Sequence, residues 1–517
     1  MDWYQPNPEQ AGCRARQGCV LQIFAFFIVL QLAKELGKHI YVGLIDYEKA
    51  FDFVNRAKLM QSLMKNNIGQ RFLRNFTNIY RDTKYITKVS DSRMGNEIAT
   101  DHGVTQGKNS SGNVFSFFIS DMKSNMENVG TNDFMDPMNL LQLADDTSTI
   151  ADNIISFIKK MLCLLQYSIQ KHQKVNNGKT KYLHMCNSAT FDDIHLDDHT
   201  AISSVLAKEG YSWLGFWLTS TEDLVKLIQF NLNKKMYVTC KFYSWLKMNE
   251  ETPFKLKIKV LYGCMFESLI YSCEAWCDIS EIAEKLLGVE RKALKSILGV
   301  KKKGTPDDLI YHELSRADIV ASIKERQFNF YKKILNFTEN DAVVRMILNR
   351  YELLSKNHTL TLYYTNLQEN SIDSDKVQRK SRISNSTTSM CIRYAELTDL
   401  DTPRALYSTL CDDRDRILIT RWRLSSHGLF VETGRRKLPK IPRNERVCII
   451  CRVLEDENHS LFHCTAHMFI RIRYQHLLEK YPSVKLLLDP DDMHGIKEVA
   501  EYIREIEKNM KNLKMGQ

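Results

Sequence analysis

Two adjacent aspartates stand in a segment that otherwise has the composition of a buried β-strand. The segment "LLQLADDTSTIAD" (residues 140–152) sets Asp145 and Asp146 between apolar residues, and "IYVGLID" (residues 40–46) likewise ends in an acid, Asp46. A buried carboxylate without a partner is unfavourable, so such groups pair, accept hydrogen bonds or bind a cation. If both segments are neighbouring central strands, three carboxylates converge where Mg²⁺ would relieve their repulsion. An exposed hairpin tip, where aspartate is common, is the alternative for the pair.

A second group of residues has the spacing of a zinc site. The segment "RVCIICRVLEDENHSLFHC" (residues 446–464) supplies the candidate ligands Cys448, Cys451, His459 and Cys464. Two thiolates separated by two residues, followed by a histidine and a cysteine, suit tetrahedral Zn²⁺ in a closed structural site. His463 is an alternative ligand, and a chance scatter of cysteines and histidines is the alternative to a site.

The elements that must position these residues are strands alternating with helices. Apolar residues recur at helical spacing over residues 49–80 and again over residues 154–172, with β-prone runs between and around them. This alternation predicts an α/β or α+β sheet domain. Lysine-rich helical patterns follow over residues 222–337. The polar stretch of residues 369–389 has neither period, which predicts a flexible linker.

Composition indicates an anionic partner. In 517 residues, 72 basic residues exceed 62 acidic ones, which gives a net charge of +10. Basic residues gather over residues 226–259 and 421–446, so nucleic acid is the first candidate. Thirteen scattered cysteines favour a reducing compartment over a disulfide framework.

One apolar run could be either a buried helix or a secretory signal. Residues 20–33, "VLQIFAFFIVLQLA", follow two arginines as in a signal peptide, but they include two glutamines and are too short to span a bilayer. We therefore expect a buried helix, no membrane association, and an intracellular protein of the nucleus, the cytoplasm or both.

Five segments in order resemble the palm motifs of reverse transcriptases, in particular those of non-LTR (LINE-like) retrotransposons. They are "LIDYEKAFD" (44–52), "GVTQGKNSSGNVF" (103–115), "LADD" (143–146), "NNGKTK" (176–181) and "YSWLG" (211–215). The segment "RLSSHGLFVETGRR", together with the cysteine–histidine group, resembles the C-terminal nucleic-acid-binding module of the same elements. The resemblance implies an α+β right-hand polymerase that extends a DNA 3′-end on an RNA template.

The resemblance also implies an order of domains. These are a remnant of the fingers and a leading helix (1–38), the palm (39–220), a helical thumb or connection (221–345), a helix with a flexible polar linker (346–400), and a basic C-terminal zinc module (401–517). The implied partners are an RNA template, a DNA primer or target, and dNTPs. The implied cofactors are two Mg²⁺ ions and one structural Zn²⁺.

The family's residue roles carry over to matching positions of this sequence. The implied catalytic residues are Asp46, Asp145 and Asp146, as Mg²⁺ ligands, and Lys179, which faces pyrophosphate. The implied substrate-binding residues are Tyr47, Phe51 as steric gate, Gln106, Gly107 and Ser111. The implied primer grip is Tyr211, Trp213, Leu214 and Gly215. A core phenylalanine and a surface lysine are the alternatives for Phe51 and Lys179.

Departures from the family's pattern favour alternatives to an active enzyme. Leu143 replaces an aromatic residue, and the second motif differs at Thr105, Lys108, Asn109 and Gly112. The resemblance begins partway into the fingers, so residues that clamp the triphosphate are expected to be absent, and electrostatic stabilisation of the reacting phosphate is a dominant catalytic contribution. The alternatives are a catalytically impaired nucleic-acid-binding remnant and a decayed reading frame.

Overall fold

The computed structural model describes residues 9–515 except for positions 15, 82, 91–92, 106–110, 128, 130–139, 186–191, 198–199, 277, 301–303, 339–341, 354–358, 368–370 and 402–403. The chain forms two compact units, each built from several segments. Unit 1 comprises Met1–Lys234, Tyr271–Ile279 and Arg326–Leu367, and unit 2 comprises Lys235–Ile270, Ser280–Glu325 and Gln368–Gln517. The domain boundaries drawn from the sequence stay predictions.

Unit 1 is built on a four-stranded antiparallel sheet with the strand order β4-β5-β1-β6. Its strands are β1 (Ile40–Ile45), β4 (Leu140–Leu143), β5 (Asp146–Ala151) and β6 (Lys181–Met185). Strand β1 is central: Val42 lies opposite Ile150 of β5 on one side and Leu183 of β6 on the other. The β-prone run and the Asp-Asp hairpin predicted from the sequence are thus neighbouring strands of one sheet.

Helix α6 (Ile154–Gln170) packs on β1 and β5. A glycine makes this contact close, because a Cβ at Gly43 would lie 2.5 Å from the sulfur of Met161 and 3.2 Å from the ring of Phe157. Asn153 caps the helix by accepting a hydrogen bond from the Ser156 N–H at 2.8 Å. The sheet and α6 therefore pack on each other as two layers. Asp46 and Asp146 lie at the ends of two strands of this sheet.

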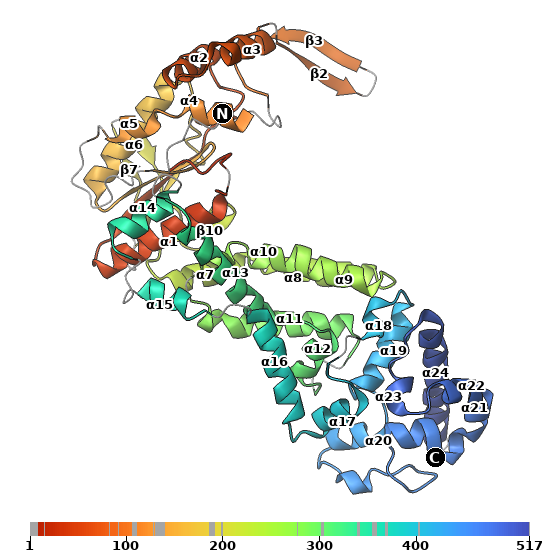
Figure 1. Ribbon diagram of the computed structural model, residues 1–517. Coiled ribbons are helices and arrows are strands. Elements are labelled where there is room, and N and C mark those ends of the chain that lie inside the picture. Colours follow the sequence, from red (N-terminus) through yellow and green to blue (C-terminus); the bar gives the residue numbers. More distant parts are fainter. Residues whose placement is uncertain are drawn as a thin grey trace. The chain divides into compact units, whose positions relative to one another are not determined.

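Further strands and helices complete unit 1. The other strands are β2 (Lys84–Ser90), β3 (Arg93–Ala99), β7 (Ile194–His195), β8 (Ala201–Ile202), β9 (Tyr211–Trp213) and β10 (Phe216–Leu218). The other helices are α1 (Cys19–Glu35), α2 (Arg56–Lys65), α3 (Gln70–Tyr80), α4 (Ser111–Phe118), α5 (Met122–Glu127), α7 (Leu224–Lys235), α14 (Val343–Arg350), α15 (Thr359–Thr365) and a short turn at Cys273–Ala275, and α13 (Ile319–Leu335) crosses the unit boundary. The β2–β3 hairpin extends beyond the ends of α2 and α3 (Figure 1).

Helix α1 is the buried helix predicted from residues 20–33. Its Phe24 packs edge-on against Phe330 with ring centroids 5.3 Å apart, and Phe27 packs against Phe216 at 5.2 Å. In Figure 1, α1 lies beside α14, which it contacts. Because protein covers α1 on nearly every face, an apolar surface all round it is explained by packing alone. Among the described residues, no helix is long and apolar enough to cross a membrane.

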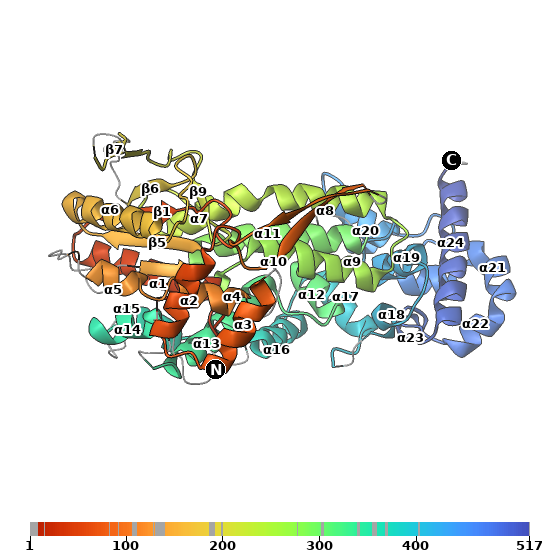
Figure 2. The ribbon, with the colours of Figure 1, turned by 90° about the horizontal axis from the view of Figure 1, so that it is seen from above.

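Unit 2 is helical over its described residues. Its helices are α8 (Tyr237–Met248), α9 (Phe254–Val260), α10 (Glu267–Leu269), α11 (Ser280–Ile297), α12 (Asp307–Glu313), α16 (Ser371–Ser384), α17 (Ser389–Leu397), α18 (Ala405–Ser408), α19 (Asp413–Arg423), α20 (Phe430–Thr433), α21 (Met468–Arg473), α22 (Gln475–Lys480), α23 (Val484–Leu487) and α24 (Met493–Met515). Short 3-10 or π-helical turns occupy Leu261–Phe266, Gly434–Arg436, Arg443–Glu445, His459–His463 and Thr465–His467. Helix α24 lies beside α21 and α22 (Figure 2) and also packs on α19.

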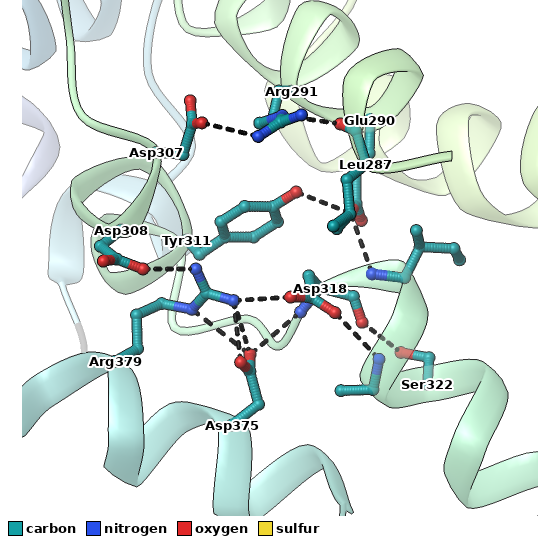
Figure 3. Close-up of polar contacts among 12 residues, drawn as sticks. Leu287, Glu290, Arg291, Asp307, Asp308, Tyr311, Asp318, Ser322, Asp375 and Arg379 are labelled. Carbon is teal, nitrogen blue, oxygen red and sulfur yellow. Dashed lines mark hydrogen bonds and ion pairs between the residues drawn. The ribbon is translucent and has the colours of Figure 1, made fainter. Parts of the chain in front are cut away.

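Helix α16 corrects the prediction of a flexible linker for residues 371–384, which are part of the predicted stretch of residues 369–389. Arg379, which is 4% exposed, is held by charge-assisted bonds from Nη1 to Asp308 at 2.7 Å and from Nη2 to Asp318 and Asp375, both at 2.8 Å (Figure 3). Asp375 lies one turn earlier on α16, while the other two acids lie far away in the sequence. These long-range ion pairs stabilise a helix whose own sequence has no apolar period.

Candidate active site and cysteine–histidine cluster

The sheet brings the three acidic residues of the sequence analysis to one end of two neighbouring strands. Asp46 directly follows β1, Asp145 lies in the β4–β5 turn, and Asp146 begins β5. Because Ile45 lies opposite Thr147 in the antiparallel pair, Asp46 and Asp146 are neighbours across the two strands. The structure therefore places the three acidic residues at the ends of neighbouring strands, and their role as joint metal ligands stays a prediction.

Burial and neighbouring carboxylates raise the pKa of Asp145 and of Asp146. Partial burial, followed by the charges of Asp145 and Asp46, raises the pKa of Asp146 to about 6, although this residue keeps contact with solvent. Partial burial, and then the charge of Asp46, also raises the pKa of Asp145. A nearby like charge disfavours the ionised form, so the cluster is short of positive charge.

Lys179 is a basic residue that pairs with one member of the acidic cluster, Asp46. Its Nζ lies 3.9 Å from Asp46 Oδ2, and its side chain is 69% exposed. One exposed ammonium does not balance three carboxylates. Carboxylate oxygens are hard donors of the kind that Mg²⁺ prefers, so these residues fit the divalent ions implied by the sequence.

A cavity of about 380 Å³ opens beside Asp46. It is lined by Asp46, Tyr47, Glu48, Lys49, Phe53, Asn176 and Lys179. The Asp46 N–H donates to Thr180 Oγ1 at 3.3 Å, so the loop that carries Lys179 is fastened to the end of β1. Phe53 and Asn176 were missed as site residues by the sequence analysis, although both lie in or beside motifs that it identified.

Tyr47 and Phe51 point into protein. The Tyr47 hydroxyl lies 3.2 Å from Ser168 Oγ, and burial raises the pKa of the phenol to about 12, so it stays neutral. Phe51 stacks on Phe115 with ring centroids 4.7 Å apart and packs on the core, whereas Phe53 lines the cavity together with Tyr47. The steric-gate role of Phe51 stays a prediction.

The second motif is described only in part. Gln106 and Gly107 lie outside the described residues. Ser111 is the first residue of α4, is buried, and donates its hydroxyl hydrogen to the carbonyl oxygen of Thr105. That bond fastens the start of the helix to Thr105.

The segment predicted as a primer grip is the β9–β10 hairpin. Leu214 (φ 49°) and Gly215 (φ 77°) form its two-residue turn, and positive φ at both positions matches the twist of a tight hairpin. The Tyr271 hydroxyl donates to the Leu214 carbonyl at 3.0 Å, and a Cβ at Gly215 would lie 3.2 Å from the Tyr271 ring. Trp213 packs on Phe26 of α1 at 5.7 Å.

Tyr211 connects this hairpin electrostatically with the acids. Burial, and then the charges of Asp46 and Asp146, raise the pKa of Tyr211 to about 12. A carboxylate influences a phenol in this way only at short range, because water screens distant charges. The hairpin therefore lies near enough to Asp46 and Asp146 for their charges to act on Tyr211.

The four cysteine and histidine residues form a compact cluster in unit 2. The ligand atoms of Cys448, Cys451, His459 and Cys464 all lie within 4.8 Å of one another, and this is the one such group found among the described residues. The Cys448 N–H donates to the Val453 carbonyl at 2.7 Å, which turns the chain so that both thiols of the pair face inward. His463, the rival ligand, is exposed.

The chemistry of this cluster fits a soft or borderline metal ion. His459 Nε2 is buried without a hydrogen-bond partner. Burial, and then the neighbouring Cys448, raise the pKa of Cys464 to about 12 in the absence of metal. An orphaned imidazole nitrogen beside three thiols is the donor set of a tetrahedral site, so the group could hold a metal ion.

Comparisons with known proteins identify the class of the first segment. Residues 5–218 match the family model described as reverse transcriptase (RNA-dependent DNA polymerase). The match covers less than half of the chain and includes all five palm motifs. Residues 5–218 therefore have the mixed helix-and-sheet fold of a reverse-transcriptase domain, and this segment resembles nucleotidyltransferases of the RNA-directed DNA polymerase class. No curated protein matches the chain.

Similar solved structures include telomerases. Apo telomerase from Candida tropicalis, truncated from its C-terminal domain, is 16% identical, with 34% of this chain and 36% of that chain covered and a TM-score of 0.27. Telomerase from Candida albicans in complex with a TWJ fragment of telomeric RNA is 12% identical, with 65% and 53% covered and a TM-score of 0.25. The chain thus spans about a third to a half of the length of these proteins.

Proposed function

We propose that this chain is the reverse transcriptase of a non-LTR, LINE-like retrotransposon, which extends a DNA 3′-end on an RNA template. The observation that carries the proposal is the meeting of Asp46, Asp145 and Asp146 at the ends of paired strands, inside the segment that matches the reverse-transcriptase family. The order of the five motifs and the C-terminal cysteine–histidine group support the retrotransposon origin.

In this proposal, residues of unit 1 have different roles in phosphoryl transfer. Asp46, Asp145 and Asp146 would hold two Mg²⁺ ions, and the chemistry that bound ions would supply there is activation of a 3′-hydroxyl and charge stabilisation of a leaving pyrophosphate. Lys179 lies beside Asp46, and its side chain is exposed. Its ammonium would neutralise charge on the pyrophosphate. Tyr211 stays neutral near the acids, and its hairpin would hold the primer end.

The cysteine–histidine cluster serves a structural role in this proposal. Cys448, Cys451, His459 and Cys464 would hold one Zn²⁺ and so join the turn after Arg446 to the helices that follow. Structural zinc contributes folding free energy directly. The exposed residues Lys437, Lys440 and Arg443 lie just before the cluster and would contact phosphates of the template or target. The protein would act in the nucleus, the cytoplasm or both.

Primer extension tests the proposal. Purified protein with an RNA template, an annealed DNA primer, dNTPs and Mg²⁺ should lengthen the primer, and omission of Mg²⁺ should abolish the product. A template of DNA alone distinguishes RNA-directed from DNA-directed synthesis. Complete absence of extension, under conditions where the protein binds the template–primer, would contradict the polymerase.

A nucleic-acid-binding protein without polymerase activity is the second candidate. The observation that favours it is the second motif, where Lys108, Asn109 and Gly112 depart from the family's pattern. The basic residues of unit 2 require neither this motif nor the acids. Salt-sensitive binding without extension would therefore select this candidate over the polymerase.

A further inference from the structure

A short segment before α1 adds an edge to the central sheet. The Gln142 N–H of β4 donates to the Glu9 carbonyl at 3.0 Å, and the Ala11 N–H donates to the Gln142 carbonyl at 2.9 Å. Gln10 thereby pairs in parallel with Gln142. Residues 9–12 consequently run alongside the strand that leads into the Ala144–Asp145 turn.

The side chain of Gln10 binds the backbone of that turn with both of its polar ends. The Ala144 N–H donates to Gln10 Oε1 at 2.9 Å, and Gln10 Nε2 donates to the Ala144 carbonyl at 3.2 Å. The Gly12 N–H donates to the same Oε1 at 2.7 Å. Gln10 is only 4% exposed, so water does not compete effectively for these bonds.

The turn needs such support. Ala144 has φ +55°, in the left-handed region that non-glycine residues rarely adopt. Strained backbone of this kind persists where the surrounding structure over-determines it. The approach also requires glycine at position 12, because a Cβ there would lie 2.3 Å from the Ala144 nitrogen. Residues 10 and 12 thus fix the one residue that joins β4 to the acidic pair.

We propose that Gln10 is a positioning residue for the acidic site: it holds the strained Ala144 and thereby sets where Asp145 and Asp146 face Asp46. The proposal rests on the proposed function for its catalytic meaning, but the clamp itself is a property of the turn. Gln10 acts through Ala144 and is not a catalytic residue.

The chain offers a matched control. Gln22 is equally buried, and its Nε2 donates to the carbonyls of Glu9 at 2.7 Å and Gln142 at 3.0 Å, so it fastens the same segment without contacting Ala144. Gln10→Met and Gln22→Met should therefore both loosen the edge segment. Only Gln10→Met should release the turn.

Hydrogen exchange of the Ala144 amide measures the clamp without any activity. In Gln10→Met the exchange should be faster by about tenfold, as for a lost buried hydrogen bond, and in Gln22→Met it should be unchanged. Gln10→Leu also removes both polar ends, so it should lose the protection to the same extent, and it serves as the second variant if Gln10→Met does not fold. Unchanged exchange in Gln10→Met would overturn the proposal.

Metal affinity measures the consequence for the site. Mn²⁺ binding, followed by electron paramagnetic resonance and corrected with an Asp145→Asn/Asp146→Asn blank, should weaken about tenfold in Gln10→Met and remain unchanged in Gln22→Met. Equal affinity in wild type and Gln10→Met would overturn the positioning role. A wild type that binds no Mn²⁺ at the acids would overturn the proposed function, while faster exchange in Gln10→Met would still support the clamp.

Discussion

The backbone N–H of Asn176 donates to the carbonyl oxygen of Asp46 at 2.8 Å. This bond fastens the loop before β6 to the end of β1 through main-chain atoms alone. A change of the Asp46 side chain therefore leaves the attachment in place, which allows the carboxylate to be tested apart from the fold.

Replacing the acids should abolish synthesis without unfolding the protein. Asp46→Asn and Asp145→Asn/Asp146→Asn each remove metal-ligand charge, and loss of metal-assisted chemistry costs orders of magnitude in rate. Asp52→Asn is the control, because Asp52 belongs to the same motif but is exposed. Gel-based primer extension and thermal melting measure both effects. Wild-type extension by the double variant would refute the metal site.

The raised pKa of Asp146 predicts a pH dependence of stability for the metal-free protein. Its pKa is about 6 in the fold and about 3.9 in an unfolded chain. Between these values the folded state binds more protons, so this residue's contribution to stability falls as the pH rises from about 4 to about 6. Thermal melting in EDTA across this range measures the effect. Asp146→Asn should flatten the profile, and an unchanged slope would contradict the assignment.

Metal removal should unfold one part of the chain selectively. Chelation, or Cys448→Ser, should increase hydrogen exchange over residues from about 440 to about 470, because a structural zinc site contributes folding free energy. Exchange in the β4-β5-β1-β6 sheet should not change. His463→Ala is the control, since His463 is exposed and outside the cluster. Metal analysis should find about one zinc per chain, and its absence after expression with zinc would refute the site.

Nucleic-acid binding should depend steeply on salt. Fluorescence anisotropy at several KCl concentrations gives the slope of the logarithm of the binding constant against the logarithm of the salt concentration. The magnitude of this slope should fall by about 2–3 when Lys437, Lys440 and Arg443 are all changed to glutamine, because each phosphate contact releases about one counterion. Exchanging lysine for arginine, and arginine for lysine, at the same positions preserves charge and should preserve the slope. A slope unaffected by the glutamine variant would exclude this surface as the phosphate contact.

Replacement of Arg379 should strongly lower the stability of unit 2. Arg379→Met leaves Asp308, Asp318 and Asp375 without their shared cation, and breaking such a buried network costs about 3–5 kcal/mol. Arg382→Met is the control on the same helix, because Arg382 also pairs with Asp308 but is 47% exposed, so it should cost about 1 kcal/mol or less. Chemical denaturation compares the two, and equal losses would contradict the network's role.

The sequence predicted those parts of the molecule that depend on local pattern. The strand before Asp46, the Asp145–Asp146 hairpin and the buried α1 follow from runs of apolar and β-prone residues, and the structure has all three. Helix α16 could not be predicted in this way, because its stabilising partners for Arg379 lie 61 and 71 residues away. Local periodicity carries no signal of such pairs.

The same limit applies within the candidate site. The spacing of residues in the sequence does not indicate that Phe53, and not Phe51, lines the cavity, because both residues follow the same strand in one irregular segment. Nor does it reveal that Gln10 reaches a turn 134 residues further along the chain. These features depend on packing between distant segments, which a single sequence does not display.

The central position of β1 has a consequence for biosynthesis. Its two neighbours, β5 and β6, begin about a hundred residues or more after it, at Asp146 and Lys181. While the ribosome makes the intervening chain, both edges of β1 remain without partners, and unpaired strand edges invite aggregation. We therefore expect a nascent chain of this protein to be prone to aggregation until Met185 has emerged, and fragments that stop earlier should be recovered as insoluble protein.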